Sequence, residues 1–379
     1  MDYKKESLKL HEENKGKFSV KSKVSVKNKE ELSLAYSPGV AAPCLAIRDD
    51  ENKVYDYTSK GNMIAVVSDG SAVLGLGNIG SLASLPVMEG KAVLFKEFGN
   101  VDAVPIVLNT QDTEEIIETV KRISPTFGGI NLEDISAPRC FEIEERLKQE
   151  LDIPIFHDDQ HGTAIVVLAG IINALKIVGK EIDKIKVVVN GAGAAGIAIS
   201  KLLIKYGVKN LVLVDSRGAV YSGREGSNKY KEEISLNNLK GEKGKLGDVI
   251  VNADIFIGVS LAGLLKSEMV ASMNEDSVIF ALANPDPEIM PEEALKAGAR
   301  IVATGRSDFP NQVNNVLVFP GIFRGALDSR VKSITDKMKI NAAEAIADIV
   351  GEERREDYII PDPFDKRVVE KVSGSLINL

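Results

Sequence analysis

The chain has 379 residues, of which 44% are hydrophobic and 27% charged, and its formal net charge is −8. This length and composition predict a globular protein with two domains, and the acidic balance argues against a surface for nucleic acid or an anionic membrane. Two cysteines, Cys44 and Cys140, cannot build a disulfide framework, so we expect small core residues in a cytoplasmic protein without a signal peptide or membrane span.

The first fifty residues predict three helices and one strand. Residues 2–15 form a charged helical pattern, and residues 18–26 alternate as a strand does. Residues 30–36 predict a helix that ends at Ser37-Pro38-Gly39. Residues 40–47 are apolar enough for a buried helix, and they would also suit an interface between subunits.

From Met63 onward, short apolar strands alternate with helices. The expected strands are 63–67, 103–108, 129–132 and 153–156, and the expected helices are 80–95, 113–123 and 138–151. This alternation is typical of a mostly parallel sheet covered by helices on both faces. The same pattern therefore predicts an α/β catalytic domain in the first part of the chain.

The stretch from Ile185 to Asp215 predicts a dinucleotide-binding fold. A buried strand, 185–190, is followed by the turn Gly-Ala-Gly-Ala-Ala-Gly at 191–196, a helix at 197–209 and a second strand at 211–215. A Rossmann βαβ unit has the same parts in the same order: a strand, a glycine turn, a helix, and a second strand that ends in an acidic residue.

Each residue type in this stretch has a physical role in binding a cofactor. Gly191 permits a tight turn, Gly193 a close approach of the pyrophosphate, and Gly196 the packing of helix against strand. The N-terminus of the helix offers N–H groups to the phosphates. Asp215 lies where a carboxylate accepts from ribose hydroxyls. The residues expected to bind the cofactor are Gly191, Gly193, Ala194, Ala195, Gly196, Asp215 and Asn284.

Strands are predicted to continue to residue 303, and the chain then becomes helical. The predicted fold is α/β: a catalytic domain at 1–160, a Rossmann-type NAD(P)-binding domain at 161–315, and C-terminal helices at 316–379 that pack back on the cleft.

Two pairs of acidic residues follow strand ends, where open α/β sheets place ligands. Glu133-Asp134 follow the strand at 129–132, and Asp158-Asp159 follow the strand at 153–156. If the pairs converge, they supply oxygen ligands for Mg²⁺ or Mn²⁺. The pairs could equally serve as acidic first turns of the following helices. Gly162 suggests that His161 barely enters its helix, which argues against a zinc site.

Lys91 and Tyr36 have two interpretations each. Lys91 lies in an apolar run, where a lysine either extends to solvent or is buried and available as a base. Tyr36 precedes a rigid turn and is either a core tyrosine or a phenol held for chemistry.

Six blocks in chain order resemble the short, bacterial and archaeal form of malic enzymes. They are Leu34–Ala41, Ser68–Gly77, Glu89–Lys91, Leu132–Asp134, Phe156–Thr163 and Asn314–Gly321. The resemblance covers residues 30–372. It implies oxidative decarboxylation of L-malate to pyruvate and CO₂, with reduction of NAD⁺ or NADP⁺.

The resemblance also implies the following roles. Glu133, Asp134 and Asp159 match the metal ligands, Lys91 the general base, Asp158 the group that holds Lys91, Tyr36 the acid that protonates C3, and Asn284 and Asn315 the substrate-binding positions. Family members usually form homodimers or higher homo-oligomers.

The chain departs from the long-form family pattern at Ala72, where those members carry an arginine that grips a malate carboxylate. Lys96 or an arginine from a partner subunit could replace it.

NAD⁺ is slightly preferred because Asp215 repels a 2′-phosphate, although Arg217 and Arg224 could bind one. The alternatives are a malolactic enzyme, an amino-acid dehydrogenase that needs no metal, and a non-catalytic dinucleotide-binding regulator.

Overall fold

The first sheet has four parallel strands in the order β2-β1-β3-β4. The computed structural model describes residues 2–377. The strands are β1 (Met63–Ser68), β2 (Asp102–Val107), β3 (Gly129–Leu132) and β4 (Ile155–His157). Because β3 and β4 are hydrogen-bonded neighbours that run in the same direction, the segments that follow them emerge side by side.

Helices connect these parallel strands, as parallel pairing requires. They are α5 (Gly80–Gly99), α6 (Thr113–Ile123), α7 (Arg139–Glu150) and α8 (Asp158–Val178). The sequence predicted these strands and the connecting helices to within a few residues, except that α8 begins four residues before the predicted Gly162.

The second sheet has six strands in the order β10-β9-β8-β5-β6-β7. Its strands are β5 (Lys186–Asn190), β6 (Asn210–Asp215), β7 (Gly218–Ala219), β8 (Ile255–Gly258), β9 (Val278–Ala281) and β10 (Ile301–Thr304). Only the pairing of β6 with β7 is antiparallel. If the strands of this sheet are numbered along the chain with β5 as the first, their spatial order is 6-5-4-1-2-3. This is the strand order of a doubly wound dinucleotide fold, in which the ligand crevice lies between the first and fourth strands, here β5 and β8. The predicted fold class is confirmed.

Helices connect the strands of the second sheet, and further helices follow it at the end of the chain. Those within the sheet's connections are α9 (Ala194–Tyr206), α10 (Lys229–Ser235), α11 (Leu246–Val249), α12 (Ser267–Ala271) and α13 (Pro291–Lys296). The C-terminal elements are η4 (Asn315–Leu317), α14 (Phe319–Asp328), α15 (Asp336–Val350) and α16 (Arg367–Ile377). Helix α14 packs on α5, and α15 packs on α8, so the end of the described chain contacts elements of its first half.

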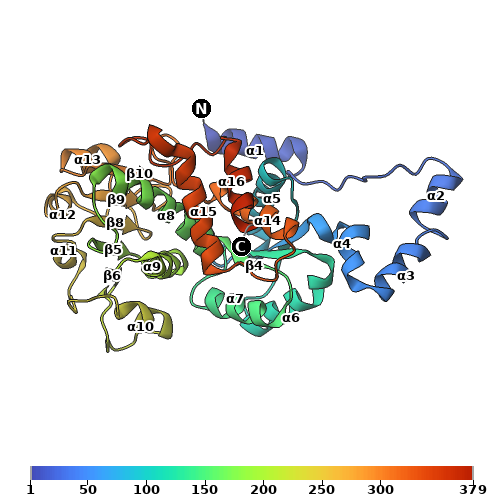
Figure 1. Ribbon diagram of the computed structural model, residues 1–379, viewed down its shortest axis with the longest axis horizontal. Helices are drawn as coiled ribbons and strands as arrows, with labels where there is room; N and C mark the ends of the chain where they lie inside the picture. Colours follow the sequence, from blue (N-terminus) through green and yellow to red (C-terminus); the bar gives the residue numbers. More distant parts are fainter. Residues whose placement is uncertain (1, 378–379) are drawn as a thin grey trace.

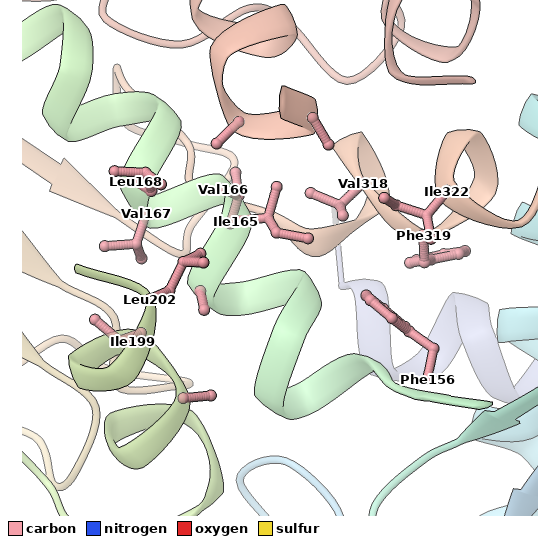
Figure 2. Close-up of a cluster of buried hydrophobic side chains, with 14 of the residues drawn as sticks. Phe156, Ile165, Val166, Val167, Leu168, Ile199, Leu202, Val318, Phe319 and Ile322 are labelled. Carbon is pink, nitrogen blue, oxygen red and sulfur yellow. The ribbon is translucent and has the colours of Figure 1, made fainter. Parts of the chain in front are cut away.

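A continuous hydrophobic core joins the two sheets through α8. Figure 2 shows α8 with Ile165, Val166 and Leu168 between Leu202 of α9 and Phe319 of α14. Helix α8 has the length and composition of a membrane span, but 72% of that apolar window is buried inside the protein, as expected of a core helix. The two halves are therefore held in a fixed relation by shared packing.

The N-terminal part departs from the sequence predictions in burial. Helices α2 (Lys29–Ala35) and α3 (Ala41–Asp49) form an arm that projects from the body, at the right of Figure 1, and neither contains a buried residue. The predicted helix at 40–47 is present, but its predicted burial is wrong within this single chain. Cys44, predicted in the core, is exposed for the same reason, whereas Cys140 is buried.

The predicted strand at 18–26 is wrong. Helix α1 (Tyr3–Asn14) ends before it, and the segment that follows is exposed along its length and pairs with no strand of the described chain. A period-two pattern becomes a ladder only through backbone hydrogen bonds to a neighbouring strand. Within residues 2–377 the segment contacts β2 through the ion pair of Lys23 with Asp102, at 3.3 Å, but makes no backbone hydrogen bond to it. Helix α4 (Val54–Tyr57) then leads into β1.

Candidate active site

Three carboxylates converge where β3 and β4 end. Glu133 and Asp134 follow β3 directly, and Asp159 is the second residue of α8, after β4. One oxygen from each lies within 4.8 Å of the others. The Asp134 N–H donates to Asp159 Oδ2 at 2.8 Å, which ties the two strand ends together. The prediction that the acid pairs meet is thus correct for these three residues.

The electrostatics of this cluster favour a bound cation. Burial, followed by repulsion from Asp159 and Glu133, raises the pKa of Asp134 to about 9. Burial likewise raises the pKa of Glu133 and of Asp159, the latter to about 6. Asp134 Oδ2 is buried and has no hydrogen-bond partner in the described part of the chain. An all-oxygen set with a free carboxylate oxygen fits a hard divalent cation such as Mg²⁺ or Mn²⁺.

Lys91 of α5 lies against this cluster and is only 8% exposed. Its Nζ is 2.7 Å from Glu133 Oε1 and 2.7 Å from Asp158 Oδ2. The ammonium also lies 4.2 Å from the centre of the Phe319 ring, a cation–π contact. Burial alone would lower the pKa of Lys91, but Asp158, Glu133 and Asp159 outweigh it and raise that pKa. Lys91 is therefore buried, as one of its two interpretations held, but its pKa is raised, whereas that interpretation required burial to lower it.

Asp158 is the first residue of α8 and is fully buried. Its Oδ2 accepts from Lys91 at 2.7 Å and from Asn315 Nδ2 at 2.6 Å. A Cβ at Gly162 would lie 1.9 Å from Asp158 Oδ1, so only glycine leaves room for this carboxylate. Gly162 is therefore an internal residue of α8, and its use as a helix-start signal was wrong.

The first turn of α8 also includes His161, which the sequence placed at the edge of the helix. His161 Nε2 lies 2.9 Å from the carboxylate of Glu144 on α7, away from the three-carboxylate cluster. Burial lowers the pKa of His161 to about 3, so the ring is neutral. The Glu144 carboxylate also accepts from the N–H of His157, which anchors the start of α8 to α7.

The glycine turn after β5 has the shape of a dinucleotide site. Gly191 adopts φ +125°, and a Cβ there would lie 2.6 Å from the Val259 carbonyl oxygen at the end of β8. A Cβ at Gly196 would lie 1.7 Å from the Gly191 oxygen, so helix and turn pack too closely for any side chain. At Gly193 a Cβ would meet no described atom within 4 Å, and this open face is where a pyrophosphate would approach. Ala194 and Ala195 open α9 beside it.

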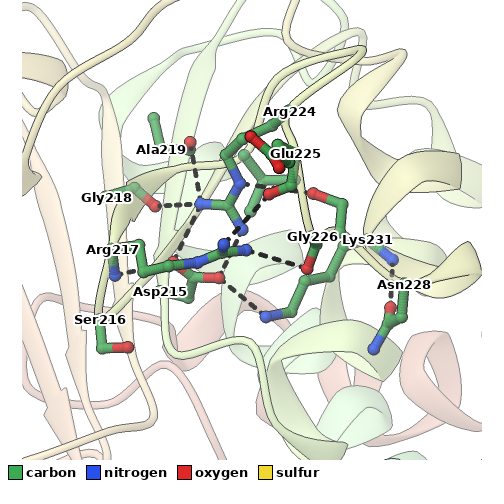
Figure 3. A network of polar contacts seen from close by, with 12 residues as sticks. Asp215, Ser216, Arg217, Gly218, Ala219, Arg224, Glu225, Gly226, Asn228 and Lys231 are labelled. Atoms are coloured by element: carbon green, nitrogen blue, oxygen red, sulfur yellow. Dashed lines mark hydrogen bonds and ion pairs between the residues drawn. The ribbon is translucent and has the colours of Figure 1, made fainter.

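Asp215, at the end of β6, is held by basic residues (Figure 3). Its carboxylate is 2.5 Å from Arg224 Nη2 and 2.8 Å from Lys231 Nζ, and it accepts from the Arg217 N–H at 2.9 Å. Burial would raise the pKa of Asp215, but the hydrogen bonds from Arg224 and Lys231 outweigh it and hold that pKa well below its usual range. The Arg217 guanidinium instead donates to backbone carbonyls in the loop that follows.

Two predicted site residues lie apart from the cluster. Tyr36 is 69% exposed on the N-terminal arm, and no hydrogen bond within residues 2–377 joins it to the site. Asn284 is exposed just after β9, where its carbonyl oxygen lies 3.3 Å from the Cβ position of Gly75 in the first half of the chain. The structure therefore assembles Lys91, Asp158 and Asn315 with the carboxylates, but neither Tyr36 nor Asn284.

The loop at Ala72 contains no replacement arginine of its own. The Ala72 N–H donates to the Asp134 carbonyl at 2.9 Å, so the position lies beside the cluster. Lys96, considered as a replacement, binds Asp102 Oδ1 at 2.9 Å on the exposed side of α5 and does not reach this loop. Arg139 approaches nearby, but its Nη2 donates to Asp69 Oδ2 at 3.0 Å.

Sequence reasoning missed three residues that support the site. Asn131 donates to Glu133 Oε2 at 2.7 Å, Phe319 lies under Lys91, and Glu144 anchors the start of α8. An asparagine inside the otherwise apolar strand β3 was a usable signal, because a buried polar group requires a partner. Phe319 and Glu144 had no such signal, since their partners are distant in sequence.

Comparisons with known proteins agree along the whole chain. The family model described as malic enzyme, N-terminal domain, matches residues 13–148, and the one described as malic enzyme, NAD binding domain, matches residues 160–373. A protein of Bacillus subtilis named as a bifunctional malic/malolactic enzyme is 65% identical over 99% of this chain and 92% of its own length. An NAD-dependent malic enzyme of Geobacillus stearothermophilus is 59% identical over 96% of this chain and 76% of its own. Other relatives are named as NADP-dependent.

A solved structure shares the fold closely. The crystal structure of malic enzyme from Pyrococcus horikoshii superposes with a TM-score of 0.95 and 52% sequence identity, covering 99% of this chain and 89% of that one. Both halves of the fold thus match one solved architecture.

Proposed function

Since this chain belongs to the malic enzyme family, an oxidoreductase family with NAD- and NADP-dependent members, we propose that it converts L-malate to pyruvate and CO₂ with reduction of NAD⁺ or NADP⁺ and with Mg²⁺ or Mn²⁺. The observation that carries the proposal is the position of Lys91 between Glu133, one of three convergent carboxylates, and Asp158. A lysine placed to accept a proton, next to an oxygen-ligand cation site, is the combination that oxidation of the malate hydroxyl requires.

In the proposed oxidation, Lys91 takes the proton of the malate C2 hydroxyl while hydride leaves C2 for the nicotinamide. A divalent cation held by Glu133, Asp134 and Asp159 would supply Lewis-acid polarisation of that hydroxyl and later of the enolate oxygen. With Glu133 and Asp159 engaged in this way, fewer negative charges would face Lys91, and its pKa would fall toward the range of a base. Asp158, fixed by Asn315, keeps the amine oriented.

Loss of CO₂ from the β-keto acid leaves enolpyruvate, which needs a proton at C3. We assign this step to Tyr36, with the proton returned from Lys91, so that the reaction is balanced. Within one chain Tyr36 is on the exposed arm. The arm also exposes Leu34 and Leu45, and a monomer rarely leaves contiguous apolar surface uncovered. We therefore propose a homo-oligomer in which the arm of one copy brings Tyr36 to the site of another.

The cofactor would lie across the glycine turn, with its pyrophosphate at the open face of Gly193 and the N-terminus of α9. We retain a slight preference for NAD⁺, because Asp215 presents a carboxylate to the ribose. The contacts of Arg224 and Lys231 with Asp215 reduce its repulsion of a 2′-phosphate, so NADP⁺ is expected to be accepted as well. Asn284 and Asn315 are proposed to bind the substrate carboxylates.

A second candidate function is the conversion of malate to lactate on the same site. The observation that favours it is the 65% identity to a relative named as a bifunctional malic/malolactic enzyme. In that reaction the reduced cofactor would be consumed again before release. We expect either activity to operate in the cytoplasm. Assays of NAD⁺ and NADP⁺ reduction by L-malate, with and without Mn²⁺, test the proposal.

A further inference from the structure

A second cavity lies beside the first turn of α8, separate from the three-carboxylate cluster. Its volume is about 430 Å³, within the range of small-molecule sites. It is enclosed by α7, α8, α9, α10 and α15, and we call it the back cavity. The residues that the argument uses are Phe141, Lys148, Gln160, Tyr230 and Lys339, with Lys205 at its rim.

One end of the back cavity is polar and incompletely satisfied. Gln160 is 4% exposed, and its Nε2 has no hydrogen-bond partner in the part of the chain that the structure describes. Lys339 is 6% exposed, and within residues 2–377 its Nζ has one hydrogen-bond partner, Asp336 Oδ1, at 3.2 Å. The ammonium of Lys148 repels that of Lys339 and, after burial, contributes to lowering the pKa of Lys339. An acceptor between the three groups would satisfy the amide and screen this repulsion.

The hydrogen-bond donors at this end outnumber the acceptors that reach them. Lys148 is paired with Glu144 at 2.7 Å. Asp336 is shared by Lys339, at 3.2 Å, and Lys205, at 3.4 Å, so neither of these lysines has a carboxylate to itself. The lining as a whole is balanced in charge, with four lysines and four carboxylates. A carboxylate ligand would supply the acceptor that Gln160 lacks and a closer partner for Lys339.

The other end of the back cavity is apolar. The rings of Phe141 and Tyr230 lie with their centres 4.4 Å apart, and both side chains are nearly buried. Ile197 and Ile234 complete this wall. The cavity therefore offers hydrogen-bond donors at one end and aromatic and aliphatic surface at the other.

We propose that the back cavity binds a small monocarboxylic acid with an apolar body, its carboxylate held by Lys339, Lys148 and Gln160. Gln160 directly follows Asp159, one of the three convergent carboxylates, in the first turn of α8. A ligand that fixes Gln160 therefore acts on the turn that carries the proposed metal ligand, and the site is regulatory. This consequence for catalysis depends on the proposed function, whereas the binding itself does not.

The experiment is isothermal titration calorimetry of the full chain with acetate, butyrate and benzoate in turn. We expect affinity to rise from acetate to benzoate as more apolar surface is buried. Lys339→Met should weaken benzoate at least about tenfold, the loss expected for one charge-assisted hydrogen bond. Lys91→Arg, which alters the other site and keeps its charge, should bind benzoate as the wild type does.

A second variant covers the case in which Lys339→Met does not fold. Lys205→Glu reverses a charge at the exposed rim and should also weaken benzoate severalfold. The proposal is overturned if none of the three acids binds. It is also overturned if Lys339→Met and Lys205→Glu both bind benzoate as tightly as the wild type does. Binding that Lys91→Arg abolishes overturns it too, because the acid then occupies the catalytic cleft. Calorimetry needs no turnover, so a chain that fails to oxidise malate still gives a clear answer here.

Discussion

Lys91 Nζ lies 2.7 Å from Asp158 Oδ2, and the same nitrogen lies 2.7 Å from Glu133 Oε1. One buried ammonium is thus shared between Asp158, which we propose orients it, and Glu133, which we propose binds the cation. Under this proposal metal binding is coupled to the basicity of the lysine, because any charge that draws Glu133 away weakens the hold on the proton.

Replacing Lys91 by arginine should separate proton transfer from charge pairing. Arginine preserves the contacts with Glu133 and Asp158 but stays protonated. We expect kcat for malate oxidation to fall about 10²- to 10⁴-fold, the range for loss of a general base, with melting temperature little changed. Lys96→Arg, on the exposed side of the same helix, is the matched control and should keep full activity. A Lys91→Arg variant that retains near wild-type kcat would refute the assignment.

Replacing Asp134 by asparagine should raise the melting temperature of the metal-free protein and abolish metal-dependent activity. Asp134 has φ +55°, a backbone conformation that asparagine tolerates well. Burial beside Asp159 and Glu133 raises the pKa of Asp134, so the wild type must take up a proton at this residue on folding, whereas asparagine is neutral in both states. We therefore expect the metal-free Asp134→Asn protein to melt at a higher temperature than the wild type. The stabilisation by Mn²⁺ seen in the wild type should be lost. Thermal melts with chelator and with Mn²⁺ measure both effects, and an unchanged Mn²⁺ response would contradict the ligand set.

The pH dependence of metal-free stability follows from the same carboxylate. The pKa of Asp134 in the folded protein is raised to about 9 from an ordinary value of 3.8. Between these values the folded state binds more protons than the unfolded state, so this group lowers stability as pH rises. We expect wild type and Asp134→Asn to have similar stability near pH 4 and to diverge toward pH 9, the variant being more stable. Denaturant midpoints measured with chelator present test this, and a gap that narrows with rising pH would be evidence against it.

Tyr36 should act in a subunit other than its own. Tyr36→Phe and Lys91→Arg are each expected to be nearly inactive alone. If the arm crosses to a partner copy, a hybrid dimer has one site with both changes and one intact site. Random assembly of equal amounts then restores about a quarter of wild-type activity. If the mixture, formed by co-expression, stays inactive, Tyr36 acts within its own chain.

The sequence predicted most of the scaffold because its signals are local. Apolar runs between turn residues located β1, β3 and β5, and the glycine turn located the start of α9 in the dinucleotide fold. Prediction from the sequence failed where pairing or burial depends on residues that are distant in the chain or belong to another copy. The segment at 18–26 has strand alternation but forms no backbone ladder with a described strand, and the apolar helix α3 has no buried residue within one chain.

In the candidate site, too, local signals were predicted and features that depend on distant partners were not. The acids were found because they follow strand ends, and adjacent parallel strands bring their ends together. Gly162 misled because its role is to make room for Asp158 inside the helix rather than to mark the helix start. The location of Tyr36 could not be predicted from residue spacing, since the arm is exposed within one chain and, in the proposed oligomer, its place depends on the partner copy.

Cofactor preference should respond to Lys231. Its ammonium lies 2.8 Å from Asp215 and adds positive charge where a 2′-phosphate would lie. We expect Lys231→Ala to lower kcat/KM for NADP⁺ several times more than for NAD⁺. Lys229→Ala removes a neighbouring lysine that binds Glu145 instead, and should leave the ratio unchanged. Equal losses for both cofactors in Lys231→Ala would show that this lysine only supports the fold.

The most direct measurement of the central claim is the product balance of the wild-type chain with L-malate, each cofactor in turn, and Mn²⁺ or chelator. The account predicts reduced cofactor and pyruvate in equal amounts, both abolished by chelator and by Asp134→Asn. Lactate without net reduced cofactor would show the malolactic reaction instead. Cofactor reduction that persists with chelator would contradict the role given to Glu133, Asp134 and Asp159.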